Sequence, residues 1–117
     1  MSYAKIALLA VCLLLTGCSR QDEQLQTEIA AQEQKVASAQ TLHRQETARL
    51  QQMQDSLQIK VRQNITLGMD EKQAEAVEHT LLKHQQALVT LANHNLQSQR
   101  DYLSLLKVRL RTLTGGP

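Results

Sequence analysis

The chain has 117 residues, which limits it to one domain at most. It contains no Phe, no Trp and only two Tyr, so the aromatic side chains that usually fill a globular core are missing. Its formal net charge of +2, with acids and bases interspersed, argues against nucleic acid as a partner. Leu, Ala, Gln, Glu, Lys and Arg dominate, and all of them favour helix. The composition therefore predicts an elongated all-α protein.

Residues 1–17 have the pattern of a secretory signal peptide. Lys5 is followed by the apolar run IALLAVCLLL, which spans about 15 Å as a helix. The hydrocarbon core of a bilayer is about 30 Å thick, so this run is too short for a permanent membrane span. We therefore expect the segment to be removed, and we exclude it from the predicted fold.

The apolar run ends in Leu15-Thr16-Gly17-Cys18. This sequence resembles the lipobox of bacterial lipoproteins, in which an aliphatic residue and two small residues precede a cysteine. The resemblance implies cleavage before Cys18 by the lipoprotein signal peptidase, a diacylglycerol thioether on Cys18, and a fatty acyl group such as palmitate on its new amino group. Two or more acyl chains anchor a protein stably, so a membrane is an expected partner. The alternative is a buried, unmodified cysteine after an uncleaved segment.

The residue after the expected anchor is Ser19. In lipoproteins of enteric bacteria an Asp at this position resembles an inner-membrane retention signal, so Ser19 implies sorting to the outer membrane, facing the periplasm. Cys12 would leave with the signal peptide and Cys18 would be blocked by lipid, so the mature chain could form no disulfide. We expect residues 18–20 to form the lipid anchor and a short tether.

Two long helices are predicted in the remaining chain. No Gly or Pro interrupts residues 21–67, and a second uninterrupted run covers residues 71–113. Residues 68–70 form the turn, because Gly68 suits a helix C-cap and Asp70 a helix N-cap. Residues 114–117 are a short tail. The pattern favours a long antiparallel helical hairpin, or coiled coil, that oligomerises; the alternative is one continuous helix, bent at Gly68, in a parallel coiled-coil oligomer.

A turn centred near Met69 predicts which residues face each other across the hairpin. The predicted pairs are Val36 with Tyr102, Leu50 with Leu88, Leu57 with Leu81, and His43 with Asn95. This register gives three apolar layers and one polar layer.

The second predicted helix carries two apolar stripes, whereas one helical partner covers a single narrow seam. We expect the partner helix to cover the first stripe, which comprises Val77, Leu81, Leu88, Leu91, Tyr102 and Leu105. The second stripe is then the predicted interaction surface, comprising Leu82, Val89, Leu96, Leu103, Leu106, Leu110 and Leu113. A second copy of the chain, an envelope protein client or a lipid surface would cover it.

No catalytic residues or cofactor are predicted, because the sequence shows no nucleophile-base-acid set and no phosphate-binding loop. An enzymatic role and a small-molecule substrate are therefore not expected. His43 and His94 come within reach of each other in the predicted hairpin, but no third ligand joins them, so no metal site is predicted. A metal-binding lipoprotein that uses His43 and His94 is kept as an alternative.

The C-terminal end is basic, with Arg100, Lys107, Arg109 and Arg111 placed among leucines. In a hairpin anchored at Cys18 this end returns to the membrane, where each basic residue near anionic lipid contributes up to about 1 kcal/mol. The alternative is that these cations simply suit the C-terminal end of a helix. We treat them as a patch for a membrane or a partner.

These features predict a structural or accessory subunit of an envelope assembly that acts through a coiled-coil surface. The murein lipoprotein is similar in being short, helical and lipid-anchored, but this chain ends in Gly115-Gly116-Pro117 and has no C-terminal lysine for attachment to peptidoglycan. The alternative is a pilotin-like chaperone for an outer-membrane secretion or conjugation component, which is similar only in size and anchorage.

Overall fold

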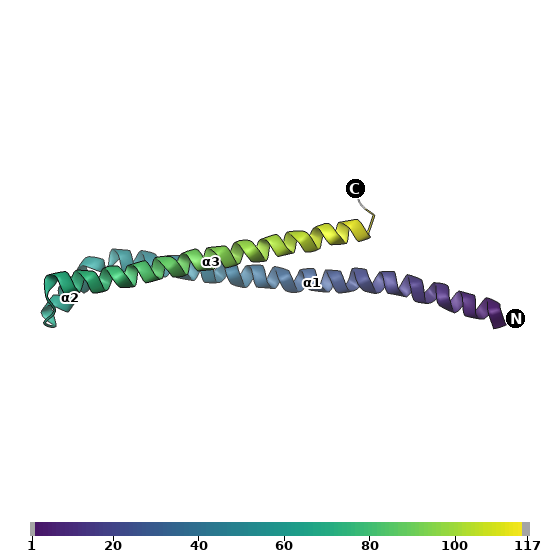
Figure 1. Ribbon diagram of the computed structural model, residues 1–117, viewed down its shortest axis with the longest axis horizontal. Helices are drawn as coiled ribbons and strands as arrows, with labels where there is room; N and C mark the ends of the chain where they lie inside the picture. Colours follow the sequence, from purple (N-terminus) through teal and green to yellow (C-terminus); the bar gives the residue numbers. More distant parts are fainter. Residues whose placement is uncertain (1, 116–117) are drawn as a thin grey trace. The chain divides into compact units, whose positions relative to one another are not determined.

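The computed structural model describes the backbone of residues 2–115 and the side chains of residues 20–115. It contains three helices, α1 (Ser2–Asp55), α2 (Leu57–Thr66) and α3 (Glu71–Leu113), which Figure 1 labels. No strand occurs in this part of the chain, so the predicted all-α class is confirmed. α1 begins at Ser2, so the backbone of residues 18–20 is helical where the sequence predicts a tether. Residues 18–20 contain no Gly or Pro that would end the helix.

The chain divides into two compact units, and in each of them α1 runs antiparallel to α3. Unit 1 comprises Met1–Lys35 and Arg100–Pro117, and unit 2 comprises Val36–Gln99. The core of unit 1 is formed by Leu25, Ile29 and Leu106, against which Leu103 and Leu110 pack. The antiparallel helical pairing that the sequence predicts is thus present in both units.

α1 meets α3 along a seam whose residues alternate three and four positions apart, which is the heptad spacing of a coiled coil. The buried members are Leu25, Ile29, Gln32 and Ala39. The half-buried members are Val36, His43, Glu46, Leu50 and Met53. Several of these side chains are small or polar, so the two helices are held by many modest layers and not by one large apolar core.

The register of both units differs from the predicted one. In unit 2, Nε2 of Gln85 donates to the main-chain carbonyl of Glu46 (2.9 Å) and to its Oε2 (2.6 Å), whereas the predicted register places Ala92 opposite Glu46. In unit 1, the hydroxyl of Tyr102 donates to Oε1 of Glu28 (3.3 Å), and Tyr102 was predicted to face Val36. The predicted pairs are therefore wrong by roughly one heptad.

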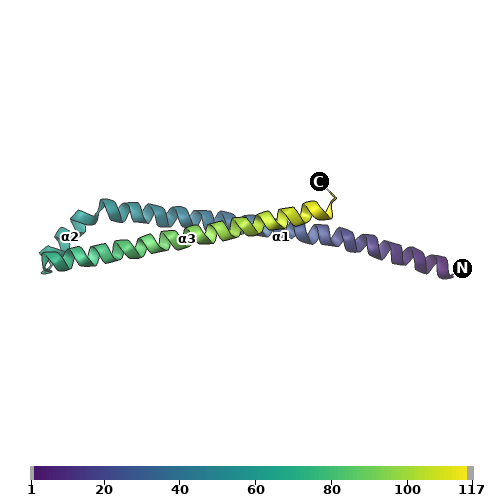
Figure 2. The ribbon, with the colours of Figure 1, turned by 45° about the horizontal axis from the view of Figure 1, so that its top comes forward.

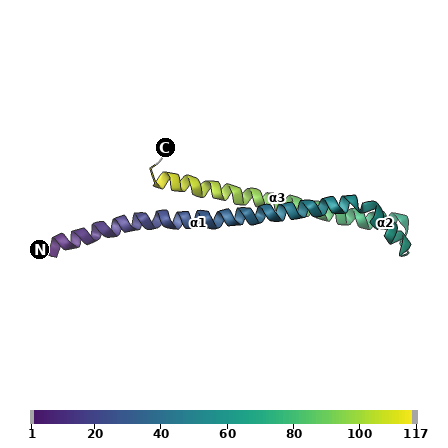
Figure 3. The same ribbon diagram turned by 180° about the vertical axis from the view of Figure 1, so that it is seen from behind.

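The register differs because the first predicted helix is not continuous from residue 21 to residue 67. Ser56 interrupts it with φ −96° and ψ 3°, and its hydroxyl donates to the carbonyl of Gln52 (2.8 Å). α2 therefore turns out of the line of α1 toward α3, as Figures 2 and 3 show from two sides. Val61 of α2 is buried, and Nδ2 of Asn64 donates to Oε1 of Glu78 (2.8 Å).

The connection between α2 and α3 is a glycine-capped helix end. Gly68 has φ 105°, its N–H donates to the carbonyl of Ile65, and the N–H of Met69 donates to the carbonyl of Asn64. These two bonds make a Schellman motif, which satisfies carbonyls that the helix end leaves free. The carbonyl of Asp70 accepts the N–H of Ala74 (2.8 Å), and α3 follows with the predicted bounds.

We predict that Gly68→Ala lowers the free energy of unfolding by about 1–2 kcal/mol, because a Cβ disfavours this backbone conformation. No atom lies within 4 Å of the position that the Cβ would take, so the loss has a conformational and not a steric cause. Gly68→Asn should lose less, since Asn tolerates positive φ better. Urea denaturation of the full chain followed by circular dichroism measures both. Gly115→Ala, also at positive φ (73°) but beyond the end of α3, is the control and should lose less, because it follows the last helix and joins no two elements. An equal effect of Gly68→Ala and Gly115→Ala would contradict the assignment of Gly68 as the residue that caps α2.

Candidate functional site

The stripe predicted as an interaction surface is the seam itself. Leu96 and Leu106 are only 4% and 3% exposed, and Leu103 and Leu110 pack against the core of unit 1. The stripe's other half-buried members are Leu82 and Val89, and its exposed member is Leu113. The prediction that this stripe faces outward is wrong for all of its members except Leu113. These leucines share the face of α3 that also carries the buried Gln85 and Ala92, and this face meets α1.

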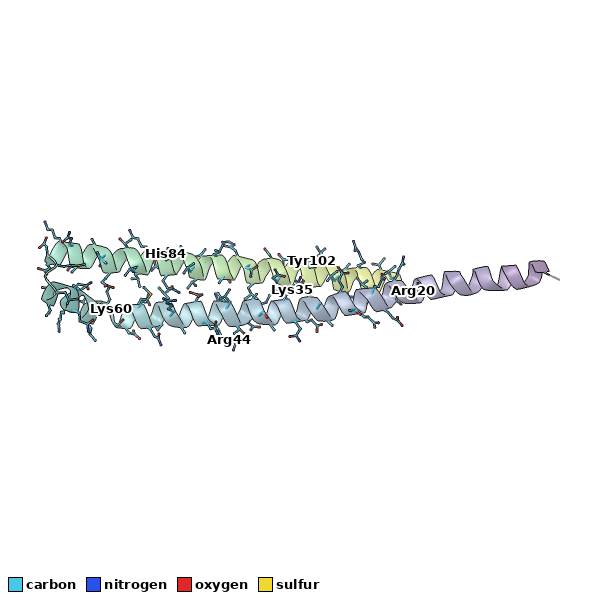
Figure 4. All side chains as sticks on the ribbon, turned by 90° about the horizontal axis from the view of Figure 1, so that it is seen from below. Arg20, Lys35, Arg44, Lys60, His84 and Tyr102 are labelled. Atoms are coloured by element: carbon cyan, nitrogen blue, oxygen red, sulfur yellow. The ribbon has the colours of Figure 1, made fainter. Side chains whose placement is uncertain are left out.

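The first stripe, predicted to be covered, is the one that stays accessible. In unit 2 we call Val77, Leu81, His84, Leu88 and Leu91 the outer stripe. Val77, Leu81 and Leu91 are 38%, 48% and 66% exposed. His84 is exposed and Leu88 is half-buried. Figure 4 labels His84 on α3. The outer stripe is therefore a row of apolar side chains along α3 with one imidazole, that of His84, in its middle.

The two flanks of the seam in unit 2 differ in chemistry. Heptad geometry places the outer stripe on one flank of α3, and the opposite flank carries His79, Gln86 and Asn93, all of them exposed. On α1 the apolar flank includes Leu42, which is 44% exposed. Arg44 lies on the side of α1 that faces away from α3, as Figure 4 shows. On α3 one flank is thus apolar and the other polar, and on α1 Leu42 shares its flank with Lys35 and Arg49.

Unit 1 has its own exposed apolar group on α3. Tyr102 (46%), Leu105 (66%), Val108 (54%) and Leu113 (49%) are all accessible. A hollow over this part of α3 is lined by Tyr102, Leu105, Leu106, Val108, Arg109, Thr112 and Leu113. It holds no carboxylate and one guanidinium, so it offers contact surface and no acid–base pair.

The predicted basic patch divides between two sides of α3. Arg100, Lys107, Arg109 and Arg111 are all exposed. Arg100, Lys107 and Arg111 are spaced seven and four residues apart and therefore share one side of the helix. Arg109 points elsewhere and lines a hollow with Gln21, Gln24, Leu25, Glu28 and Leu113. Three of the four predicted cations thus form one basic stripe.

The turn end of unit 2 is also apolar. Leu67 is 83% exposed, and Ile59, Ile65 and Met69 are 58%, 40% and 39% exposed. A hollow along α2 is lined by Ile59, Arg62, Gln63, Thr66 and Leu67. These residues recur three and four positions apart, so they occupy one accessible face of α2.

The seam contains polar groups whose hydrogen bonds are complete. Gln85 (3% exposed) is held by Glu46, and Glu78 (8% exposed) accepts from Asn64. Among the described residues no buried side-chain nitrogen or oxygen lacks a hydrogen-bond partner. Satisfied polar layers of this kind specify register.

The histidines are not brought together. His43 is half-buried and His94 is exposed. Because Glu46 meets Gln85, the register places His43 near Leu88 and Val89 and not beside His94. Within the described part of the chain no group of three or more His, Cys, Asp or Glu side chains could hold a metal ion.

The lipidation and sorting residues Leu15, Thr16, Gly17, Cys18 and Ser19 lie outside the side chains that the structure describes. Of the described residues, none belongs to a helix with an apolar stretch long enough to cross a bilayer. No protein-family model, curated protein or solved structure matches the chain.

Sequence reasoning recognised both stripes of α3 but exchanged their roles. The signal that distinguishes them is the uninterrupted heptad spacing of α1 through Gln32, Ala39 and Glu46. Glu46 bonds to Gln85 across the seam. Gln85 and Ala92 are buried, and they alternate with the second-stripe residues Leu82, Val89 and Leu96 at three- and four-residue spacing.

We predict that Leu106→Ala lowers the free energy of unfolding by about 2–4 kcal/mol, because it opens a cavity in the core of unit 1. The matched variant is Leu105→Ala, whose side chain is 66% exposed against 3% for Leu106. It should lose less than about 1 kcal/mol. Thermal and urea unfolding of both variants measures the difference. A larger loss for Leu105→Ala than for Leu106→Ala would mean that the first stripe, and not the second, packs against α1.

Proposed function

We propose that this protein is a lipid-anchored lipoprotein of the bacterial outer membrane that faces the periplasm and serves as an interaction subunit of an envelope assembly. Cys18 carries the anchor, and α3 presents the surface that its partner contacts. The lipobox-like Leu15-Thr16-Gly17-Cys18 supports the anchorage. The exposed outer stripe supports the role in protein contact.

The outer stripe is the observation that carries the proposal. Isolated exposed apolar residues are common on soluble proteins, but a continuous row at helical spacing marks a surface that another molecule covers. Val77, Leu81 and Leu91 are exposed although α1 already covers the other stripe of α3. The seam polar groups are satisfied and the described side chains form no metal-binding group, so association is the chemistry that this surface supports best.

The arrangement of unit 1 suits attachment at Cys18. Its core joins Leu25 and Ile29 of α1 to Leu106 of α3, so the segment that follows Cys18 lies beside the basic end of α3. Arg100, Lys107 and Arg111 on one side of that end are placed to approach lipid headgroups when Cys18 is anchored.

We predict that Cys18→Ala, exported behind a leader that an ordinary signal peptidase removes, leaves the membrane fraction while its helix content stays unchanged, because the substitution removes the acyl chains and Ala favours helix. Fractionation of cells followed by an alkaline wash measures release, and circular dichroism measures helicity. Cys12→Ala is the matched control and should remain in the membrane. Persistence of the Cys18→Ala protein in the washed membranes would refute lipid anchorage.

A direct contact between the basic stripe and lipid is a second candidate role, favoured by the shared side of Arg100, Lys107 and Arg111. In the Cys18→Ala background, changing all three to Gln should weaken binding to vesicles containing anionic lipid by about tenfold or more at low salt. Vesicle co-sedimentation measures it.

The control for that experiment replaces Lys35, Arg44 and Lys60 with Gln. These residues lie on α1 and α2, as Figure 4 shows, and their replacement removes the same charge. Equal weakening by both triple variants would mean that overall charge, and not the basic stripe, drives vesicle binding.

A further inference from the structure

We propose that the outer stripe of α3 pairs in parallel with the outer stripe of a second copy of this chain. The partner surface is therefore identical to the stripe itself. Only the parallel direction of the pairing rests on the proposed function, because it follows from anchorage of both copies in one bilayer.

The spacing of the outer stripe matches that of a second coiled-coil seam. Val77, Leu81, His84, Leu88 and Leu91 are separated by four, three, four and three residues. Knobs at this spacing insert into the holes of a helix that has the same repeat. The side chains that such a neighbour would remove from water include Leu81 and Leu91, now 48% and 66% exposed. A helix with two adjacent seams is expected in a bundle of more than two helices.

The electrostatics of the stripe favour a second copy over a charged client. A parallel symmetric pair places each residue against its own counterpart, so any charge in the contact would repel itself. The outer stripe contains no Asp, Glu, Lys or Arg, and its outward neighbours Thr80 and Ala87 are small and neutral. The nearby carboxylate of Glu78 is buried and bonded to Asn64. An acidic or basic client would need an opposite charge that the stripe lacks.

Parallel pairing sets which residues meet. Two copies anchored at Cys18 leave the membrane in the same direction, so Leu88 meets Leu88 of the second copy and Leu91 meets Leu91. His84 then forms one polar layer between apolar layers. A single polar layer in a coiled-coil seam costs stability but selects register and orientation.

Site-specific photocrosslinking in intact cells tests the pairing in the full chain. A photoreactive residue at Leu91 should crosslink to a second copy, detected by co-expressing copies with two different tags. The same residue at Asn93, on the opposite flank, should not. Tryptic mapping reports direction: parallel copies join position 91 to the peptide of residues 84–100, whereas opposed copies join it to residues 73–83.

A charge variant tests the contact on purified protein in detergent. Leu81→Glu with Leu91→Glu should weaken self-association by at least about 100-fold, because two carboxylates per copy would be forced together without water. Gln86→Glu with Asn93→Glu adds the same charge on the opposite flank and should leave association unchanged. Sedimentation velocity measures association, and circular dichroism should show equal helix content in all three proteins.

Several results would overturn the proposal. These are a wild-type monomer at 100 µM, a crosslink from position 91 to a different protein only, a crosslink into residues 73–83, and loss of helicity in the Leu81→Glu, Leu91→Glu variant. The last would show that the stripe packs inside the hairpin. The failure of lipid anchorage is read separately, from Cys18→Ala fractionation, and a self-associating protein that stays out of the membrane would refute only the anchorage.

Discussion

The seam along α1 is the constraint on which the rest of the structure depends. The chain has no Phe or Trp, and its best-formed core is three aliphatic side chains, Leu25, Ile29 and Leu106. Stability must therefore come from repetition, with one layer per half-heptad and small residues such as Ala39 and Ala92 allowing the helices to approach closely. Because each layer contributes little, the polar layers are tolerated only where their hydrogen bonds are complete, as Gln85 and Glu46 show.

The bounds of α3 could be predicted from the sequence because they rest on local chemistry. Gly68 supplies the positive φ that ends one helix, and Asp70 precedes the next. The interruption at Ser56 could not be predicted in the same way, since no Gly or Pro marks it and Thr27, Thr41 and Thr47 make the same hydroxyl-to-carbonyl bond within unbroken α1. The predicted pairs were counted outward from the turn near Met69. A bend at Ser56 therefore displaces every predicted pair that lies farther from the turn than Ser56.

The two stripes on α3 differ in which of them runs beside the buried polar and small residues of the seam. The covered stripe runs beside Gln85 and Ala92, whereas the exposed one holds Leu81, Leu88 and Leu91 in close succession. The covered stripe is also the richer in leucine, so hydrophobicity alone ranks the two stripes in the observed order. The accessible apolar surface therefore follows from the face of α3 that pairs with α1.

α2 is the shortest helix of unit 2, and its connections to the rest of the unit are few. It is joined to α1 through the bend at Ser56, to α3 through the glycine cap, and to the rest of the unit through buried Val61 and the amide–carboxylate bond from Asn64 to Glu78. Partial unfolding has a natural boundary at such a point, since α2 has far fewer interhelical contacts to lose than the long helices. We therefore expect the end that exposes Leu67 to have the lowest free energy of local unfolding in unit 2.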